Sequence, residues 1–230
     1  MEISKHKKTA VIAGATGLVG SYCLQYLLEH PNYAKVIHLG RRKVELEHDK
    51  LQQHRIDFDR PEKYRHLIRG QDIYCCLGTT MAKAGSKEAF IEVDFTYVMR
   101  LANYGLANGA SQFLLVSSVG ADPDSIFFYT RIKGETEKAL KELPYWAIHI
   151  FQPSFLLGSR PENRWGEKIA SRIGKGIDKV TGGMLTKYKP VEAEVVARAM
   201  VGAAQQLDPG IHLHASHHLQ KLAEEYDEEW

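Results

Sequence analysis

Tyr129 and Lys133 are the residues of this 230-residue chain whose types and spacing best suit proton transfer. They lie four positions apart in a segment, 127–143, that predicts a helix, so their side chains share one face. A tyrosine has a usual pKa of about 10, and a nearby ammonium favours its phenolate form, which makes proton exchange near neutral pH feasible. A Tyr-x-x-x-Lys pair is expected about once by chance in a chain of this composition, so the position of the pair must carry the argument.

The position of the Tyr129–Lys133 pair is significant because a candidate catalytic serine, Ser118, precedes it in the chain. Ser118 ends the apolar run 112–118, which predicts a buried strand directly before the helix that holds Tyr129. Its hydroxyl could orient a substrate carbonyl or alcohol, whereas Ser117 lies one position back in the strand and is the weaker candidate. Capping of the loop is the alternative role for both serines.

Three glycines, the first of which ends the first predicted strand, 9–14, lead into the next helix. A turn of this kind uses Gly14 for the tight bend, Gly17 for close approach of the backbone to a pyrophosphate, and Gly20 for packing of helix on strand. The helix N-terminus adds unpaired N–H groups and a partial positive charge. We therefore predict a dinucleotide site here that also includes Thr16, Leu18 and Val19. An ordinary tight strand-to-helix turn is the alternative.

The ends of the next two strands indicate which dinucleotide binds. The second strand, 35–40, ends in Gly40 and is followed by Arg41 and Arg42, with no acid in the place where an NAD site holds the ribose hydroxyls. Guanidinium groups bind phosphate through bidentate hydrogen bonds, so the sequence favours NADP. Solvated surface arginines are the alternative. Asp57 and Phe58, after the third strand, are predicted beside the adenine, although Asp in this place is also a common turn residue.

Strands and helices alternate along most of the chain, and the strands are nearly continuous apolar runs. The pattern predicts a single α/β domain, 1–230, with a doubly wound, Rossmann-like parallel sheet, helices on both faces, and a substrate-side region in 154–230. The predicted strands are 9–14, 35–40, 54–58, 72–78, 112–118, 145–153 and 211–215, and the predicted helices are 18–30, 61–68, 87–109, 127–143, 164–180 and 192–207.

Composition narrows the classes of partner and compartment. The formal charge of +2 gives no basic surface for nucleic acid, and no stretch is long and apolar enough to span a bilayer. Three cysteines, two of them adjacent, make neither a disulfide framework nor a zinc site, which favours a reducing, cytoplasmic setting. No metal site is expected: the histidines in 212–218 lack a carboxylate or cysteine scaffold, so we expect a structural or surface role for them.

The order of these motifs resembles short-chain dehydrogenases/reductases, and the glycine spacing resembles their extended and atypical members. The stretches CCLGTTMAKAG, VDFTYV, VSSVGAD and KGETE resemble the atypical family of the HIV Tat-interacting oxidoreductase-like protein and its bacterial relatives, over nearly the whole chain. The resemblance implies bound NADP, with cofactor contacts from Leu77, Gly78, Thr79, Thr80, Tyr129 and Lys133, a loop carrying Lys83 over the cofactor, and nicotinamide-side contacts from Pro153, Phe155 and Leu156.

Two positions depart from the family pattern. Gln152-Pro153-Ser154 stands where relatives often have Arg-Pro-Gly, which puts the details of the nicotinamide contacts in doubt. Asp94 stands where many members of the wider superfamily have asparagine, and the sequence gives no ground for assigning it a catalytic role.

Two functions fit these observations. In the first, the protein is an NADP(H)-dependent oxidoreductase of a small carbonyl or alcohol: Tyr129 supplies the proton, Lys133 favours its release and Ser118 holds the oxygen. In the second, bound NADP(H) sets the shape of a redox-sensing regulator for a protein partner. The complete Ser-Tyr-Lys set favours the enzyme, because a sensor needs only the glycines and the arginines. The substrate and the oligomeric state are left open.

Overall fold

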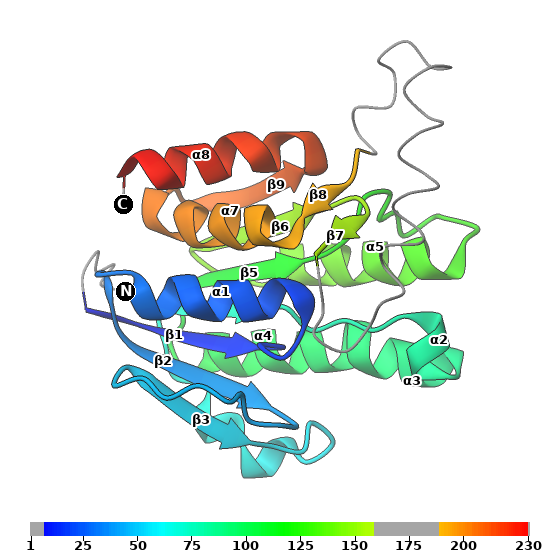
Figure 1. Cartoon of the computed structure of the whole chain (residues 1–230). Helices are drawn as coiled ribbons and strands as arrows, with labels where there is room; N and C mark the ends of the chain where they lie inside the picture. The colour runs from blue at the N-terminus through cyan, green and yellow to red at the C-terminus, as the bar shows by residue number, and fades with distance from the viewer. Residues whose placement is uncertain (1–6, 159–188, 230) are drawn as a thin grey trace.

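A computed structural model describes residues 7–158 and 189–229 of the chain. It contains a seven-stranded parallel sheet in the order β3-β2-β1-β4-β5-β6-β9, shown in Figure 1. The strand bounds are β1 Lys8–Ala13, β2 Tyr33–Gly40, β3 Leu51–Arg55, β4 Asp72–Cys75, β5 Gln112–Val116, β6 Ala147–Gln152 and β9 Gly210–Ala215. This confirms the predicted doubly wound sheet: the order reverses between β1 and β4, which is where such folds open a crevice for ligands.

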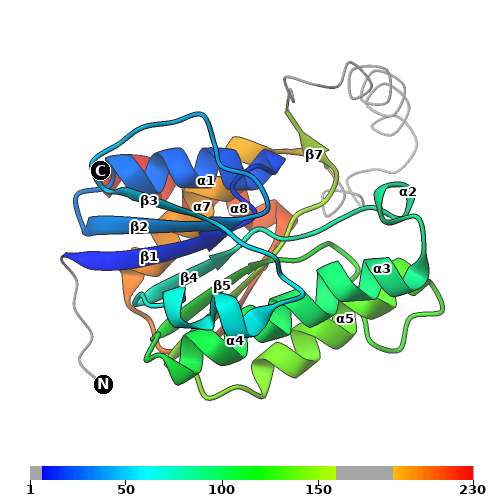
Figure 2. The ribbon, with the colours of Figure 1, turned by 90° about the horizontal axis from the view of Figure 1, so that it is seen from below.

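Helices cover both faces of the sheet, as Figure 2 shows. One face carries α1 (Leu18–Glu29), α7 (Ala193–Gln206) and α8 (Leu219–Glu229), and the other carries α3 (Lys87–Ile91), α4 (Tyr97–Ala107) and α5 (Phe128–Lys141). Each face has its own cluster of buried apolar side chains. The strands are buried from both sides, which is why they appear in the sequence as apolar runs and not as alternating ones.

The third strand and the segment after it differ from the prediction. The strand is Leu51–Arg55, three residues upstream of 54–58, because the chain leaves the sheet when Phe58 turns into the core against Tyr64 and Tyr97. The predicted helix 61–68 consists of two short 3₁₀ turns, Pro61–Lys63 and Arg65–Leu67.

The predicted helix 87–109 is interrupted by a π-helical turn at Glu92–Thr96, between α3 and α4. Turns of this kind are rare and occur frequently at functional sites. The turn places Asp94 in the interior, with 1 % of its surface exposed.

The described parts of the last third of the chain contribute partly to the main sheet layer and partly to a separate two-stranded sheet. The elements α7, β9 and α8 belong to the main sheet and its covering layer. Short strands β7 (Leu156–Leu157) and β8 (Val191–Glu192) pair with each other at the end of the sheet where the main strands terminate (Figure 1). Helix α8 and the β7–β8 pair were not predicted, and the predicted helix 164–180 lies outside the described residues. No helix in the described ranges is long and apolar enough to cross a membrane.

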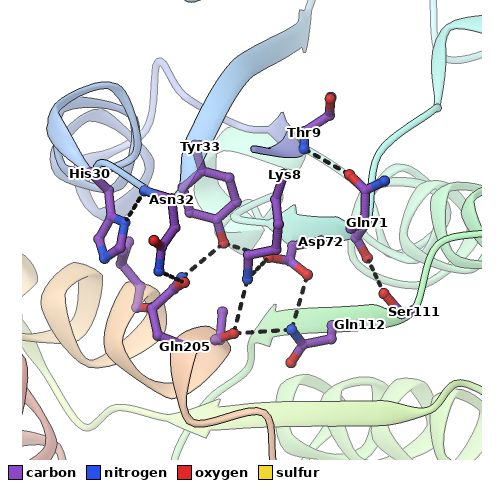
Figure 3. Close-up of polar contacts among 12 residues, drawn as sticks. Lys8, Thr9, His30, Asn32, Tyr33, Gln71, Asp72, Ser111, Gln112 and Gln205 are labelled. Carbon is purple, nitrogen blue, oxygen red and sulfur yellow. Dashed lines mark hydrogen bonds and ion pairs between the residues drawn. The ribbon is translucent and has the colours of Figure 1, made fainter. Parts of the chain in front are cut away.

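A buried polar network ties the opposite end of the sheet together, as Figure 3 shows. Lys8 Nζ lies 2.6 Å from Asp72 Oδ2, and that carboxylate also accepts hydrogen bonds from the Tyr33 hydroxyl and from Gln112 Nε2. Gln205 of α7 donates to the Tyr33 hydroxyl. A buried ion pair is tolerated only when such hydrogen bonds compensate its desolvation, so this network fixes the first residues of four strands relative to α7.

Candidate functional site

The glycine turn between β1 and α1 forms the floor of the site. Gly14 has φ +90°, and a Cβ there would lie 2.4 Å from the Cys76 carbonyl oxygen; a Cβ at Gly20 would lie 2.2 Å from the Gly14 carbonyl oxygen. Both positions therefore need glycine for the packing of the chain itself. A Cβ at Gly17 would meet only two carbonyl oxygens, at 3.1 and 3.9 Å. The packing of the turn accordingly explains Gly14 and Gly20 fully and Gly17 only in part.

The N-terminus of α1 is open to an anion. Gly17 is its N-cap, no side chain caps the first turn, and the first turn carries no acid. Thr16 is exposed and Leu18 is partly exposed, whereas the side chain of Val19 is buried, so Val19 can offer only its backbone. Uncapped N–H groups and the helix dipole together suit a phosphate group.

Arg41 and Arg42 are both exposed at the end of β2. Within the described ranges, neither guanidinium group makes a side-chain hydrogen bond or an ion pair. Their charge at the end of this strand is therefore available to an anionic ligand. The same exposure also fits the alternative of solvated surface arginines.

Asp57 and Phe58 differ in their environments. The Asp57 side chain is 59 % exposed, lies 3.6 Å from Arg60 Nε, and accepts a hydrogen bond from the Asp59 backbone, as a turn residue does. The Phe58 ring is buried, with its centroid 5.1 Å from that of Tyr97. Asp57 is therefore accessible to a ligand beside this strand end, whereas the prediction that Phe58 walls the adenine is not met, because its ring is covered by Tyr64 and Tyr97.

The loop after β4 crosses the glycine turn. It contains Leu77, Gly78, Thr79 and Thr80, of which Gly78 and Thr80 are exposed and the other two are partly exposed. Thr80 caps α2 (Met81–Ala84), accepting a hydrogen bond from the Lys83 backbone, so Lys83 lies on a short helix and not on a loop.

Ser117 and Ser118 follow β5 and have separate environments. The Ser117 hydroxyl is buried and donates to Glu137 of α5 at 2.5 Å, and Gln152 donates to both oxygens of the same carboxylate. The partly exposed Ser118 hydroxyl has one long contact, 3.3 Å, to the Val119 carbonyl. Ser117 is thus held within the structure, whereas the Ser118 hydroxyl is free to bond a ligand.

Tyr129 and Lys133 lie one turn apart on α5. The Tyr129 side chain is exposed, at 37 %, and its ring packs on Phe90 with centroids 5.6 Å apart. Lys133 is buried, with Nζ 2.8 Å from Asp94 Oδ1. Burial alone would disfavour the ammonium, but the charges of Asp94 and Tyr129 outweigh it and raise the pKa of Lys133 above its usual value.

The residues predicted on the nicotinamide side follow β6. Pro153 is buried and its carbonyl accepts a hydrogen bond from the Val119 backbone, which joins this segment to the loop that holds Ser118. Phe155 and Leu156 are exposed, at 60 and 37 %. Gln152, at one of the departures from the family pattern, bonds Glu137 as described above.

Two residues on or beside α5 were missed by sequence reasoning. Asp94 lies against Lys133, and its only sequence signal was the departure from asparagine. Gly134 allows α5 to approach the loop after β5, because a Cβ there would lie 2.2 Å from the Asp122 carbonyl carbon. The signal for Gly134 was a glycine inside a helical pattern, which often marks such close approach.

The C-terminal histidines pack on one another and on rings of β6. The rings of His149, His212 and His214 stack on one another along β6 and β9, and no cluster of metal-binding side chains occurs among the residues that the structure describes. The stack is a packing feature of the sheet face.

The doubly wound sheet and the glycine turn at the start of α1 are typical of nicotinamide-dinucleotide-binding proteins, and comparison with known families agrees. The chain belongs to the NAD dependent epimerase/dehydratase family, whose model matches residues 10–139. Among individual proteins, it is 37 % identical to Protein HTATIP2 of Rattus norvegicus over 176 residues, covering 75 % of this chain and 72 % of the relative. It is 33 % identical to the mitochondrial Protein FMP52 of Coccidioides immitis over 208 residues, covering 85 % of each chain. These relatives confirm the resemblance inferred from the sequence motifs.

Solved structures confirm the fold. MoeE5 in complex with UDP-glucose and NAD superposes with a TM-score of 0.68 at 16 % identity, covering 89 % of this chain and 74 % of that one. UDP-glucose 4-epimerase of Thermotoga maritima, with UDP-glucose, gives a TM-score of 0.68 at 15 % identity, covering 96 and 82 %. At these identities the likeness extends to the architecture alone.

Proposed function

We propose that the protein is an NADP(H)-dependent oxidoreductase of the atypical short-chain dehydrogenase/reductase type, acting on a small carbonyl or alcohol. The observation that carries the proposal is that Ser118 follows the carboxyl end of β5 with a hydroxyl that makes only one long contact, and that Tyr129 and Lys133 lie one turn apart near the start of the next helix, α5. The family and the uncapped N-terminus of α1 support a nicotinamide dinucleotide. A cytoplasmic location, a single domain and a substrate-side region in 154–230 belong to the same proposal.

The cofactor would lie across the carboxyl ends of the strands. Its pyrophosphate would meet Gly17 and the N–H groups of Leu18 and Val19. The 2′-phosphate would meet Arg41 and Arg42, and the adenine would lie beside Asp57. The loop from Leu77 to Thr80, together with Pro153, Phe155 and Leu156, would line the nicotinamide half.

The protein side chains would handle the proton of the reaction. Ser118 donates a hydrogen bond to the substrate oxygen, and Tyr129 gives its hydroxyl proton to that oxygen as the carbonyl is reduced. Lys133 stabilises the phenolate that remains. The nicotinamide ring, when bound, supplies the hydride to the carbonyl carbon.

Isothermal titration tests the choice of cofactor. NADPH is expected to bind much more tightly than NADH, because the two guanidinium groups match a 2′-phosphate that NADH lacks. The double change Arg41→Ala and Arg42→Ala should remove most of the difference while leaving NADH affinity nearly unchanged. Equal affinities of the unaltered protein for the two cofactors would reject NADP specificity.

A turnover assay tests the reaction. NADPH oxidation is followed at its absorbance band with a panel of small aldehydes and ketones. Tyr129→Phe is expected to abolish turnover of any substrate found and to leave NADPH affinity unchanged, since the change removes only the hydroxyl. Tight NADPH binding with no turnover across the panel would favour the alternative, a redox-sensing regulator. Retention of turnover within a few-fold in Tyr129→Phe would remove the tyrosine from the mechanism.

A further inference from the structure

Asp94 is a buried acid paired with Lys133, the lysine one helical turn from the proposed proton donor Tyr129. Its side chain is fully buried and its Oδ1 lies 2.8 Å from Lys133 Nζ, whose own side chain is 7 % exposed. An ion pair so far removed from water is screened little by solvent, so the negative charge acts strongly on its neighbours.

The other oxygen of Asp94 reaches the loop after β4. Oδ2 accepts a hydrogen bond of 2.8 Å from the Thr79 backbone N–H, in the stretch proposed to line the cofactor. A Cβ at Gly78 would lie 3.4 Å from Asp94 Oδ1 and 3.7 Å from Lys133 Nζ. The carboxylate therefore joins the cofactor-side loop to the helix that carries Tyr129 and Lys133.

The π-helical turn holds Asp94 in this place. The Thr136 hydroxyl of α5 lies 3.0 Å from the Asp94 carbonyl oxygen and 2.8 Å from the carbonyl of Ile132, and is positioned to donate to either one. Contact with α5 from both the backbone and the side chain of Asp94 leaves the carboxylate little freedom to turn away from Lys133.

The charge of Asp94 opposes the effect of Lys133 on Tyr129. An ammonium favours the phenolate, whereas a carboxylate beside that ammonium offsets it. Among the described residues, the thiol of Cys75 at the end of β4 also acts on Lys133, and burial raises the pKa of that thiol to about 12, so it stays neutral. Among the described residues, Asp94 is the carboxylate that pairs with the Lys133 ammonium.

We propose that Asp94 is a positioning residue that fixes Lys133 and sets the pH at which Tyr129 exchanges its proton. The proposal rests on the proposed function, since it assigns Tyr129 and Lys133 their roles. It predicts that a neutral side chain at this position, the amide found in many members of the wider superfamily, makes the site work at lower pH.

The test follows the ionisation of Tyr129 directly and needs neither substrate nor cofactor. The protein is labelled with ¹³C at the tyrosine Cζ, the Tyr129 signal is assigned by its loss in Tyr129→Phe, and its shift is titrated by NMR. In Asp94→Asn the midpoint is expected to fall by about one pH unit, because the opposing charge is gone. Asp94→Glu keeps the charge and is expected to stay near the unaltered midpoint.

In Asp94→Asn the buried Lys133 ammonium loses its partner, which could prevent folding. A second pair of variants, made without that ammonium, keeps the proposal testable if it does. Lys133→Met should raise the midpoint, and adding Asp94→Asn to it should lower the midpoint again by about one unit. Folded variants whose midpoints do not respond to Asp94→Asn in either background would overturn the proposal and leave Asp94 a structural residue only.

The same variants separate this proposal from the proposed function. If Asp94→Asn shifts the titration and also moves the pH–rate profile of the turnover assay to lower pH, both stand. If the titration shifts but the unaltered protein neither binds NADPH nor turns over any substrate, the charge balance stands and the oxidoreductase function fails.

Discussion

Ser117 and Ser118 are adjacent residues for which the structure supports opposite roles. Ser118→Ala is expected to lower turnover at least tenfold while leaving the melting temperature unchanged, because its hydroxyl has only a long contact within the protein. Ser117→Ala should leave a buried carboxylate short of a donor, which costs about 1–3 kcal/mol, and should lower the melting temperature by several degrees. Steady-state kinetics and calorimetry on the two variants check this.

The pair serves as its own control. Each variant removes one hydroxyl from the same dipeptide, so a general disturbance of the loop would affect both measurements in both proteins. If Ser118→Ala lost stability and kept its rate, the serine would be a loop cap, which is the alternative that the sequence left open.

The sequence could predict the site residues whose partners are local. Tyr129 and Lys133 are related by helical spacing, and Ser118 follows from the end of a strand. Asp94 could not be predicted in the same way: its partner lies on another helix, and it reaches that partner through a π-helical turn that residue periodicity does not reveal. The buried bond between Ser117 and Glu137 likewise depends on how α5 packs on the end of β5.

At the scale of elements, the glycine turn separates cofactor binding from folding. Gly17→Ala adds a methyl group that meets only two carbonyl oxygens, at 3.1 and 3.9 Å, so the variant is expected to fold with a modest loss of stability. NADPH should no longer raise its melting temperature, because the methyl group occupies the space proposed for the pyrophosphate. NADPH at a hundred times its dissociation constant should stabilise the unaltered protein by about 2.7 kcal/mol, or roughly 5–10 °C.

Gly20→Ala is the matched control, measured by the same thermal scan. Its Cβ would lie 2.2 Å from a backbone oxygen that cannot yield, so the loss should appear in folding even without NADPH. A Gly17→Ala protein that is folded and still responds fully to NADPH would show that the phosphates bind elsewhere.

The order of the elements was predictable, and some of their boundaries were not. Buried parallel strands and amphipathic helices leave clear patterns, which is why all seven strands of the main sheet were predicted. The third strand was placed three residues too late because Ile56 and Phe58 look like strand residues, yet Phe58 turns inward to pack on Tyr64 and Tyr97. Helix α8 is acidic, and its buried face packs on α7, a partner that the local sequence does not indicate.

For the whole molecule, buried histidines make stability depend on pH. Burial, with help from nearby positive charge, lowers the pKa of His30 to about 4; burial beside other histidines lowers that of His149 to about 3 and that of His214 to about 4. In the unfolded chain these imidazoles have pKa values near 6.5. Below that pH the unfolded state therefore binds more protons than the folded state, which favours unfolding. Stability is therefore expected to fall as the pH drops from 6.5 towards 4.

Calorimetry between pH 7.5 and 5.0 checks this, because most carboxylates remain ionised over that range. The melting temperature should be level above about pH 7 and should fall by several degrees by pH 5.0. The NMR signals of the three imidazoles should remain those of neutral rings throughout. A melting temperature that is constant down to pH 5.0 would contradict the expectation.

The ion pair of Lys8 with Asp72 has a consequence for chemical labelling. The Lys8 ammonium is buried at 2 % exposure, donates to the Ala204 carbonyl and lies 5.0 Å over the Tyr33 ring, so an acylating reagent in solution has no path to it. Acylation needs a neutral, accessible amine, and Lys8 becomes one only when β1 separates from its neighbours. The rate at which Lys8 is acylated, compared with that of the exposed Lys83 and measured in tryptic digests, would therefore report how often this end of the sheet opens.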